Sequence, residues 1–478
     1  MPTRVINVGS ADTSDDPYLY ETERQRDNYF ALSHCWGKKP VITTTRRTLE
    51  SRKAGLEWCS LPKTIQDAIL LTRRLGVNYL WVDSLCIIQD DTTDWEREAS
   101  RMGAVYENAR LVISAAAASD SMQGFMNVRA QPQEIKATDI HGQSMKIFAR
   151  VWEPLEHNRF STSLGSTSMK AEMNMVGEHQ LPLFKRAWVL QERLLARRVI
   201  HYTLFESIWE CSSTQSCECG GINKRSVPLY AERDENLKVA HRRYTVEVDA
   251  AERMRHWEYL VLHYSRRQLT YSLDKLVAIS GLARQIALPE MGRYLAGIWE
   301  GSLVRELQWI ILKQGSEEVH RRRLPNRAPS WSWAAFEGPL QWFGGQYGDT
   351  KEIFRSDIVD IDVGYDIPGG FDKTDSGYLR VRGLWASSTS DFTRTLFTNL
   401  DPVGYMIFDP SSHGDWGLLC LQAFKEEPRH PSQTVKIDVR MLVLVASKAV
   451  VGAYERVGAK MINAGSLEGL EEKVITLI

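Results

Sequence analysis

The stretch Tyr29–Gly37 reads YFALSHCWG, a short apolar run that ends in histidine, cysteine, tryptophan and glycine. An apolar run of this length is typical of a buried strand, and the glycine favours a turn directly after it. The three side chains before the glycine would then stand at the carboxyl end of the strand, where each could take part in chemistry or recognition. We therefore expect this stretch to form the first core strand of an α/β domain and one wall of a site.

The segments after this stretch alternate between helical and strand-like patterns. Residues 61–76, LPKTIQDAILLTRRLG, have apolar residues at helical spacing, and Gly76 can end the helix. Three more segments continue the alternation, as a strand at 78–88, a helix at 93–109 and a strand at 111–118. Strands that alternate with helices indicate an α/β layer with a mainly parallel sheet.

We expect four parts along the chain. Residues 1–28 form an N-terminal extension, and residues 29–211 form a domain with an α/β core at about 29–120 and a further helix at RAWVLQE. Residues 212–330 form a helical region, because charged and apolar residues recur there at helical spacing. Residues 331–478 form a β-rich part, because YLRVRGLWA and VKIDVRMLVLVAS alternate with period two.

The composition limits the classes of partner. Lys and Arg number 59 and Asp and Glu number 60, and this net charge of -1 argues against general nucleic-acid binding. No segment approaches the ~20 apolar residues of a membrane span, and the polar N-terminus does not resemble a secretory signal. The seven scattered cysteines fit reduced thiols. We therefore expect a cytoplasmic protein that binds neither membrane nor nucleic acid.

One acidic residue of the helix expected at 93–109 is a candidate for chemistry. The helix has an apolar stripe that includes Trp95, and Glu98 lies about 60° from that residue around the axis. A half-buried carboxylate tends to have a raised pKa and can serve as an acid, a base or a charge stabiliser. The alternative is a boundary glutamate paired with an arginine such as Arg97 or Arg101, which helix geometry alone favours.

Two polar residues, Asp83 and Ser84, interrupt the apolar run at 78–88. Ligands of open α/β sheets bind beyond the carboxyl ends of the strands. Asp83 and Ser84 would then share one edge of the sheet with His34 and the residues that follow it. The alternative is that Asp83 caps a turn or pairs locally.

A further cluster, Arg186, Trp188, Gln191 and Glu192, lies on one expected helix. Arg186 and Trp188 could reach the same ligand edge, since arginine suits phosphate recognition. The alternative is a structural Arg–Glu pair that docks this helix on the α/β core. Both roles can hold together.

The sequence evidence for cysteine chemistry and for metal binding is weak. Cys217 and Cys219 have C-x-C spacing, but no second Cys or His pair stands at finger spacing, so we expect ordinary thiols around a glycine-rich turn and no metal. Cys35 and His34 would face opposite sides of a strand, which makes them a poor catalytic pair. A base for Cys35 could come from His141, His201 or His263. The absence of G-x-S-x-G, Walker and G-x-G-x-x-G motifs argues against common hydrolases, NTPases and Rossmann oxidoreductases.

A run of ordered motifs resembles one family. YFALSHCWG, LPKTIQDAI, LGVNYLWVDSLCIIQDD, DWEREASRMGAVYENA and RAWVLQERLL with WEC resemble the fungal heterokaryon incompatibility (HET) domain over residues 29 to about 211. The later YSRRQLTYSLDKLVAISGLA, YLAGIW and PSWSWA resemble the part that commonly follows that domain. In one departure, the family's first motif usually has tyrosine at the place of His34.

The resemblance implies a role in fungal non-self recognition and regulated cell death, and a remote likeness to Toll/interleukin-1 receptor (TIR) domains. It therefore implies a TIR-like, flavodoxin-like sheet core. The spacing of Trp95 and Glu98 is similar to the neighbourhood of the catalytic glutamate in TIR domains that cleave NAD. Carried over, Glu98 would hold the nicotinamide ribose and stabilise an oxocarbenium-like transition state, with Trp36 and Trp95 as stacking or packing partners.

These observations define the candidate site. The catalytic candidates are Glu98, Asp83 and His34. The ligand-binding candidates are Ser33, Cys35, Trp36, Gly37, Ser84, Trp95, Arg186 and Trp188. No metal and no cofactor are expected, and NAD would be a substrate.

Three functions are compatible with the sequence. The first is a TIR-like NAD glycohydrolase that acts through Glu98. The second is a non-catalytic module that signals by self-association or through an incompatibility partner protein. The third is a HET scaffold recruited to transform another small metabolite in biosynthesis, which the departure at His34 keeps open.

Overall fold

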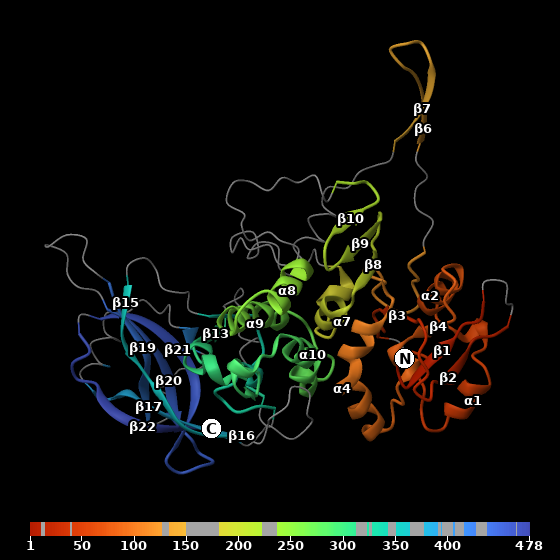
Figure 1. Cartoon of the computed structure of the whole chain (residues 1–478). Helices are drawn as coiled ribbons and strands as arrows, with labels where there is room; N and C mark the ends of the chain where they lie inside the picture. The colour runs from red at the N-terminus through yellow and green to blue at the C-terminus, as the bar shows by residue number, and fades with distance from the viewer. Residues whose placement is uncertain are drawn as a thin grey trace. The chain divides into compact units, whose positions relative to one another are not determined.

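The computed structural model of the chain forms two compact units, residues 1–246 and residues 247–478, and each is described by itself (Figure 1). The residues that the structure describes are 1–10, 15–38, 41–126, 133–149, 181–221, 237–311, 323–324, 327–342, 350–363, 377–390, 393, 405–406, 415–426, 437–464 and 466–478.

An eight-stranded sheet forms the centre of the first unit. Its strands are β1 (Arg4–Asn7), β2 (Tyr18–Glu21), β3 (Phe30–Ser33), β4 (Tyr79–Trp81), β5 (Leu111–Ser114), β8 (Arg198–Tyr202), β9 (Ser207–Cys211) and β10 (Gln215–Cys217). The order across the sheet is β10-β9-β8-β5-β3-β4-β1-β2, and the central strands β8, β5, β3 and β4 run parallel. The expected mixed α/β fold with a mainly parallel central sheet is therefore confirmed.

Strands β1 and β2 come from the segment that we expected to precede the domain as an extension. β1 pairs antiparallel with β2 on one side and with β4 on the other, where Ile6 stands opposite Leu80. Val5 and Ile6 are fully buried. The RVIN segment is too short to predict a strand from its own pattern, and its burial depends on pairing with a strand far along the chain.

Helices and turns connect these strands. They are α1 (Leu49–Ala54), η1 (Trp58–Ser60), α2 (Lys63–Arg74), α3 (Asp83–Cys86), α4 (Thr92–Asn108), η2 (Pro182–Lys185), α7 (Val189–Leu195) and α8 (Leu237–Val246), and β6 (Gln133–Thr138) pairs with β7 (Ser144–Ala149) in a hairpin. The helices expected at 61–76 and 93–109 are confirmed as α2 and α4. The strand expected at 78–88 ends at Trp81, and the rest of that prediction is wrong, because α3 begins at Asp83. A carboxylate oxygen of Asp83 accepts a hydrogen bond from the Ser84 amide at 2.8 Å, a local bond that competes with strand pairing.

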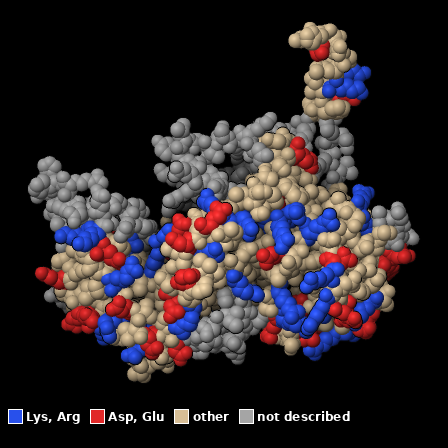
Figure 2. Space-filling view, viewed as in Figure 1, with Lys and Arg blue, Asp and Glu red and all other residues tan. Residues whose placement is uncertain are grey.

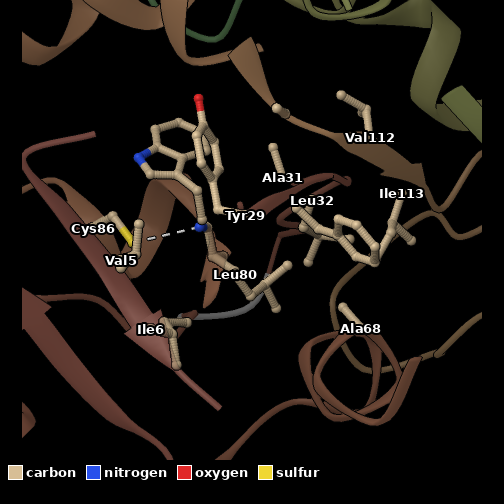
Figure 3. Close-up of a cluster of buried hydrophobic side chains, with 14 of the residues drawn as sticks. Val5, Ile6, Tyr29, Ala31, Leu32, Ala68, Leu80, Cys86, Val112 and Ile113 are labelled. Carbon is tan, nitrogen blue, oxygen red and sulfur yellow. Dashed lines mark hydrogen bonds between the residues drawn. The ribbon is translucent and has the colours of Figure 1, made fainter. Parts of the chain in front are cut away.

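The core of the first unit lies between the sheet and its helices. Figure 3 shows side chains of β1, β3, β4 and β5 packed together, with Ala68 of α2 against them. All four residues of β3 are buried, because β3 has strands on both sides and helices over its faces. The apolar run after Tyr29 thus forms the central strand, as its pattern predicts.

The second unit combines helices with a β-rich part. Its helices, turns and short hairpins are α9 (Ala250–Ser265), η3 (Ser272–Lys275), α10 (Val277–Ile286), η4 (Pro289–Met291), β11 (Tyr294–Leu295), β12 (Ile298–Trp299), η5 (Glu300–Ser302), α11 (Leu303–Glu306), β13 (Trp309–Ile311), η7 (Trp333–Ala335) and β14 (Leu340–Trp342). The β-rich part consists of β15 (Thr350–Arg355), β16 (Asp357–Val363), β17 (Gly377–Ser387), β18 (Tyr405–Met406), β19 (Trp416–Glu426), β20 (Ile437–Ala446), β21 (Ala453–Ala464) and β22 (Glu471–Leu477).

The β-rich part closes on itself. The strand order is β15-β19-β20-β21-β22-β17-β16, and β17 also pairs with β19. The strands β19, β20, β21, β22 and β17 therefore form a ring, which removes exposed edges from the centre of the sheet. The expected β-rich C-terminal part is confirmed.

The surface carries charges of both signs. Lys and Arg side chains are interspersed with Asp and Glu over the face seen in Figure 2, in line with the net charge of -1. Among the described residues, no helix is long and apolar enough to cross a membrane. All seven cysteines lie in described residues, and each is a thiol.

Candidate functional site

The carboxyl ends of β3 and β4 meet at one edge of the central sheet, where Trp36 and Asp83 contact each other. The indole Nε1 of Trp36 donates to both carboxylate oxygens of Asp83, at 3.1 and 2.9 Å. Both side chains are half-buried. Because β3 and β4 are parallel neighbours, the segments that follow them leave the sheet side by side. The structure thus brings Trp36 and Asp83 together at the edge where the sequence places them.

A second carboxyl group, Glu192 of α7, contacts the end of β3. The hydroxyl of Ser33 donates to Glu192 Oε2 at 2.5 Å, and the Tyr106 side chain of α4 also hydrogen-bonds with Glu192. Burial raises the pKa of Glu192 to about 7, although Arg186 and these hydrogen bonds act in the opposite direction. A carboxyl group with such a pKa can both hold and release a proton near neutral pH, as a general acid must.

His34 is enclosed at the same edge. Its side chain is 2% exposed, and neither ring nitrogen has a hydrogen-bond partner within the described part of the chain. Burial lowers the pKa of His34 to about 4, with Asp83 raising it and Arg186 lowering it further. Arg186 also donates a hydrogen bond to the backbone carbonyl of His34. The imidazole is therefore neutral at pH 7, and buried polar atoms without partners are rare enough to indicate a role or a bound water.

Cys35 has the environment of a packed thiol. It lies in an apolar cluster with Leu183 and Phe184, and burial raises the pKa of its thiol to about 11. The thiolate, which is the nucleophilic form, is therefore scarce near neutral pH. Of the bases considered for Cys35, His201 is engaged with other buried side chains, described below, and His263 belongs to the second unit.

Gly37 and Ser84 lie at the same edge of the sheet, after β3 and β4. Gly37 has φ +88°, and a Cβ at this position would lie 2.3 Å from the Cβ of Asp120 in the segment after β5. Glycine is therefore required both by the backbone conformation and by this close approach. The Ser84 hydroxyl is buried and has no hydrogen-bond partner among the described residues, while its amide binds Asp83.

Glu98 lies in a different environment from the groups at the carboxyl ends of β3 and β4. It accepts hydrogen bonds from the Thr3 hydroxyl at 2.8 Å and from Arg97 Nε at 3.1 Å, and it is 2% exposed. Together with Tyr29 it lines a hollow of about 650 Å³. Neither Asp83 nor Glu192 lines this hollow, so Glu98 faces a different space from these two carboxyl groups. The contact with Arg97 matches the structural alternative for Glu98.

The two remaining ligand-binding candidates, Trp95 and Trp188, are half-buried. Both pack against the hydrophobic core of the first unit. For Trp95 this is the packing role that its place on the apolar stripe of α4 suggests.

Sequence reasoning missed a buried polar network that anchors α7. Arg193 donates two hydrogen bonds, both of 2.7 Å, to Glu210 of β9. His201 of β8 places Nε2 at 3.0 Å from Glu210 Oε2 and Nδ1 at 3.0 Å from the hydroxyl of Ser114. Lys238 of α8 donates to the backbone carbonyl of Arg193. The sequence feature that could have revealed this network is the two-residue periodicity of β8 and β9. It directs the side chains of His201 and Glu210 toward the interior.

This network resembles a serine–histidine–glutamate triad in its contacts, but its burial favours a structural role. Ser114, His201 and Glu210 are all enclosed. Burial lowers the pKa of His201 to about 4. Burial alone would raise the pKa of Glu210, but Arg193 and His201 outweigh it and hold that pKa well below its ordinary value. The network fixes α7 on the sheet and so positions Glu192.

The comparisons with known proteins identify a family for part of the chain. Residues 29–192 match the family model described as heterokaryon incompatibility protein (HET). No curated protein and no solved structure matches the chain. The matched region runs from Tyr29, before β3, to Glu192 in α7, and it therefore contains every group of the carboxyl edge described above. Residues 29–192 of this chain are a heterokaryon incompatibility domain.

Proposed function

We propose that the HET domain of this chain is an enzyme that cleaves the glycosidic bond of a nucleotide, with NAD as its substrate, at the carboxyl edge of the parallel strands. The observation that carries the proposal is the buried Glu192 carboxyl group, hydrogen-bonded to Ser33, in one cluster with Asp83 and His34. Glycosidic cleavage commonly uses two carboxyl groups, one that transfers a proton and one that stabilises positive charge. Loss of NAD would connect such an activity to regulated cell death in incompatibility reactions.

Glu192 and Asp83 have environments that suit these two roles. The pKa of Glu192 is about 7, so part of the population is ionised near neutral pH, and in that form the carboxylate would accept a proton from the water that attacks the anomeric carbon of the ribose. Nicotinamide would leave as a neutral base that takes the electron pair of the glycosidic bond. Asp83 is half-buried and held by Trp36, so its carboxylate would face the developing oxocarbenium charge. Two carboxyl groups in such different surroundings are the usual basis for assigning the group that transfers a proton and the group that stabilises charge.

Arg186 and Trp36 would hold the substrate. Both are half-buried, and both are tied to the edge, by the bond of Arg186 to the His34 carbonyl and by the bond of Trp36 to Asp83. A guanidinium group suits phosphate, and an indole ring suits stacking on a base. The two ring nitrogens of His34, which have no hydrogen-bond partner among the described residues, would complete the polar lining.

The strand order supports a TIR-like, flavodoxin-like interpretation. In chain order the parallel strands run 2-1-3-4 across the sheet, with β3 between β4 and β5 and with β8 beyond β5. Sheets of this order bind ligands where the connections leave the first strand in opposite directions. Ser33 ends that first strand and His34 follows it, which supports a ligand at this position.

Glu98 is the second candidate for the catalytic carboxylate, on its resemblance to the TIR motif. Its bonds to Thr3 and Arg97 favour a structural role, and the hollow that it lines contains neither Asp83 nor Glu192. Mutagenesis of Glu98 and Glu192 therefore tests directly which of the two carboxyl groups is catalytic.

The test is release of nicotinamide when the purified full-length chain is incubated with NAD, followed by chromatography. Glu192→Gln should lower kcat by at least about 100-fold, since a group that transfers a proton in general acid–base catalysis contributes roughly that much. Glu107→Gln, a control on α4 away from the edge, should leave kcat unchanged. Loss of activity in Glu98→Gln with retention in Glu192→Gln would transfer the role to Glu98.

Two further outcomes would overturn the proposal. Absence of nicotinamide release, together with assembly that depends on protein concentration, would favour the non-catalytic signalling module. Turnover of another metabolite in place of NAD would favour the recruited biosynthetic enzyme, and the Glu192→Gln comparison would then be repeated on that substrate.

A further inference from the structure

Two cysteines and one glutamate meet at the β10 edge of the central sheet. Cys217 ends β10, Cys219 follows it in a turn, and Glu206 directly precedes β9. One side-chain ligand atom of each residue lies within 4.8 Å of the other two. The Sγ atoms of Cys217 and Cys219 are 3.4 Å apart, and Cys219 Sγ lies 3.5 Å from Glu206 Oε1.

The separation of the two sulfur atoms distinguishes a disulfide from a metal site. A disulfide bond would require a distance of about 2.05 Å. Two thiolates that bind one tetrahedral zinc ion at about 2.3 Å would stand about 3.8 Å apart. The observed 3.4 Å is much nearer to the second arrangement, so binding an ion needs a side-chain shift of only a few tenths of an ångström.

Two backbone amides donate hydrogen bonds to side-chain atoms of this cluster. The amide of Gly221 donates to Cys219 Sγ at 3.3 Å, and the amide of Cys219 donates to Glu206 Oε2 at 3.0 Å. Such bonds stabilise the charged forms of thiolates and carboxylates and orient metal ligands. Gly220 turns the chain with φ +67°, a conformation that favours glycine, so the next amide can reach back to the sulfur.

The backbone of Glu206 is held independently of the cysteines. Its amide donates to the Thr203 hydroxyl at 3.3 Å, and that hydroxyl donates to the Glu206 carbonyl at 2.7 Å. Glu206 is buried, whereas Cys217 and Cys219 are half-buried. The cluster therefore combines one enclosed ligand with two ligands that solvent can partly reach.

We propose that Glu206, Cys217 and Cys219 bind a zinc ion, with water as the fourth ligand. Thiolates select zinc over magnesium or calcium, and three protein ligands with one open position are a common zinc arrangement. Binding releases two protons, one from each thiol, and changes no oxidation state. The ion ties the turn between β8 and β9 to the end of β10. None of the three ligands is a residue assigned to the proposed glycosidic cleavage, so zinc binding does not depend on that activity.

The experiment measures metal bound to the full-length chain after it is reduced, loaded with zinc and dialysed. One equivalent of zinc is expected, and cobalt substitution should give the thiolate-to-metal charge-transfer band. Cys217→Ser, Cys219→Ser and Glu206→Gln should each weaken zinc binding by at least about tenfold. Cys211→Ser is the matched control, since this thiol lies on β9 of the same hairpin outside the three-residue cluster, and its zinc binding should equal that of the wild type.

Three results would overturn the zinc site. The first is a reduced wild-type chain that retains no zinc. The second is a Cys211→Ser variant that binds zinc as weakly as Cys217→Ser. The third is a purified chain whose mass shows a disulfide between Cys217 and Cys219 in place of metal. Thermal unfolding of each variant without metal separates a lost ligand from a lost fold, and NAD cleavage plays no part in the readout.

Discussion

Glu192 and Glu210 are both fully buried carboxyl groups of the same unit, yet their pKa values move in opposite directions. Glu192 is hydrogen-bonded by the neutral side chains of Ser33 and Tyr106, and burial raises its pKa to about 7. Glu210 receives two bonds from the guanidinium of Arg193, which hold its pKa well below the ordinary value in spite of burial. The comparison shows that a directly bonded cation, and not burial alone, decides which buried carboxyl group keeps its proton.

The two environments are coupled through one short helix. Glu192 and Arg193 are neighbours on α7, and about 100° of helix rotation separates their side chains. Arg193 is directed to Glu210 of β9, and Glu192 to the end of β3. The ion pair therefore anchors the helix that presents the proton-holding carboxyl group.

The largest effect on stability is expected when the cation of this ion pair, Arg193, is removed. Arg193→Met should lower the free energy of unfolding by about 3–5 kcal/mol, because it leaves Glu210 charged and buried without its partner. Urea denaturation at neutral pH measures the change. Arg74→Met, at an exposed position of α2, is the control and should stay within about 0.5 kcal/mol. If Arg193→Met lost less than about 1 kcal/mol, another group would stabilise Glu210. That result would contradict the explanation of why the pKa values of Glu192 and Glu210 differ.

The next effect is a dependence of stability on pH that comes from Glu192. Its pKa of about 7 in the folded chain exceeds the ordinary 4.5, so the folded chain binds the proton more tightly. The stability that this proton contributes is fully present below pH 4.5 and is lost as the pH rises through 7, a total of about 3 kcal/mol. Denaturation of Glu192→Gln across this range should lack that decline. Parallel curves for the variant and the wild type would contradict a raised pKa.

The smallest of the three effects concerns His34, whose pKa is lowered to about 4 from 6.5. The unfolded chain binds the proton more tightly, so stability is present above pH 6.5 and is lost as the pH falls through 4. His34→Phe should remove about 2 kcal/mol of the loss between about pH 7 and 5, and change stability at pH 7 by about 1 kcal/mol or less. His201→Phe is the contrasting variant, because it breaks contacts with Ser114 and Glu210 and should destabilise the chain already at pH 7. Equal losses at pH 7 for both variants would show that His34 has an unrecognised partner.

The predictions from sequence succeeded where local pattern governs structure. The buried strand after Tyr29, the helices α2 and α4 and the strand β5 all follow from the spacing of nearby apolar residues. β1 and α3 were missed because their conformation depends on partners or on one side-chain bond. β1 is a strand because it pairs with β4 and β2, and α3 begins where Asp83 binds the amide of Ser84.

The candidate site was predicted in part. The contact of Trp36 with Asp83 follows from the rule that parallel strands place their carboxyl ends at one edge. Glu98 was ranked as the main carboxylate on motif spacing, but spacing could not show that Thr3 and Arg97 would bind it. Glu192 entered the sequence reasoning as a structural partner of arginine, since its distance from Ser33 along the chain concealed their contact.

The sequence by itself determined the alternation of strands and helices, the resemblance to the HET family and the polar residues at the end of the first core strand. Each of these depends on residues that are close together in the chain. Only the tertiary structure decided which carboxyl group carries a proton near neutral pH and which thiols stand beside a glutamate. Ser33 and Glu192 are 159 residues apart, and a pKa or a metal site depends on the burial and the charges that folding brings together.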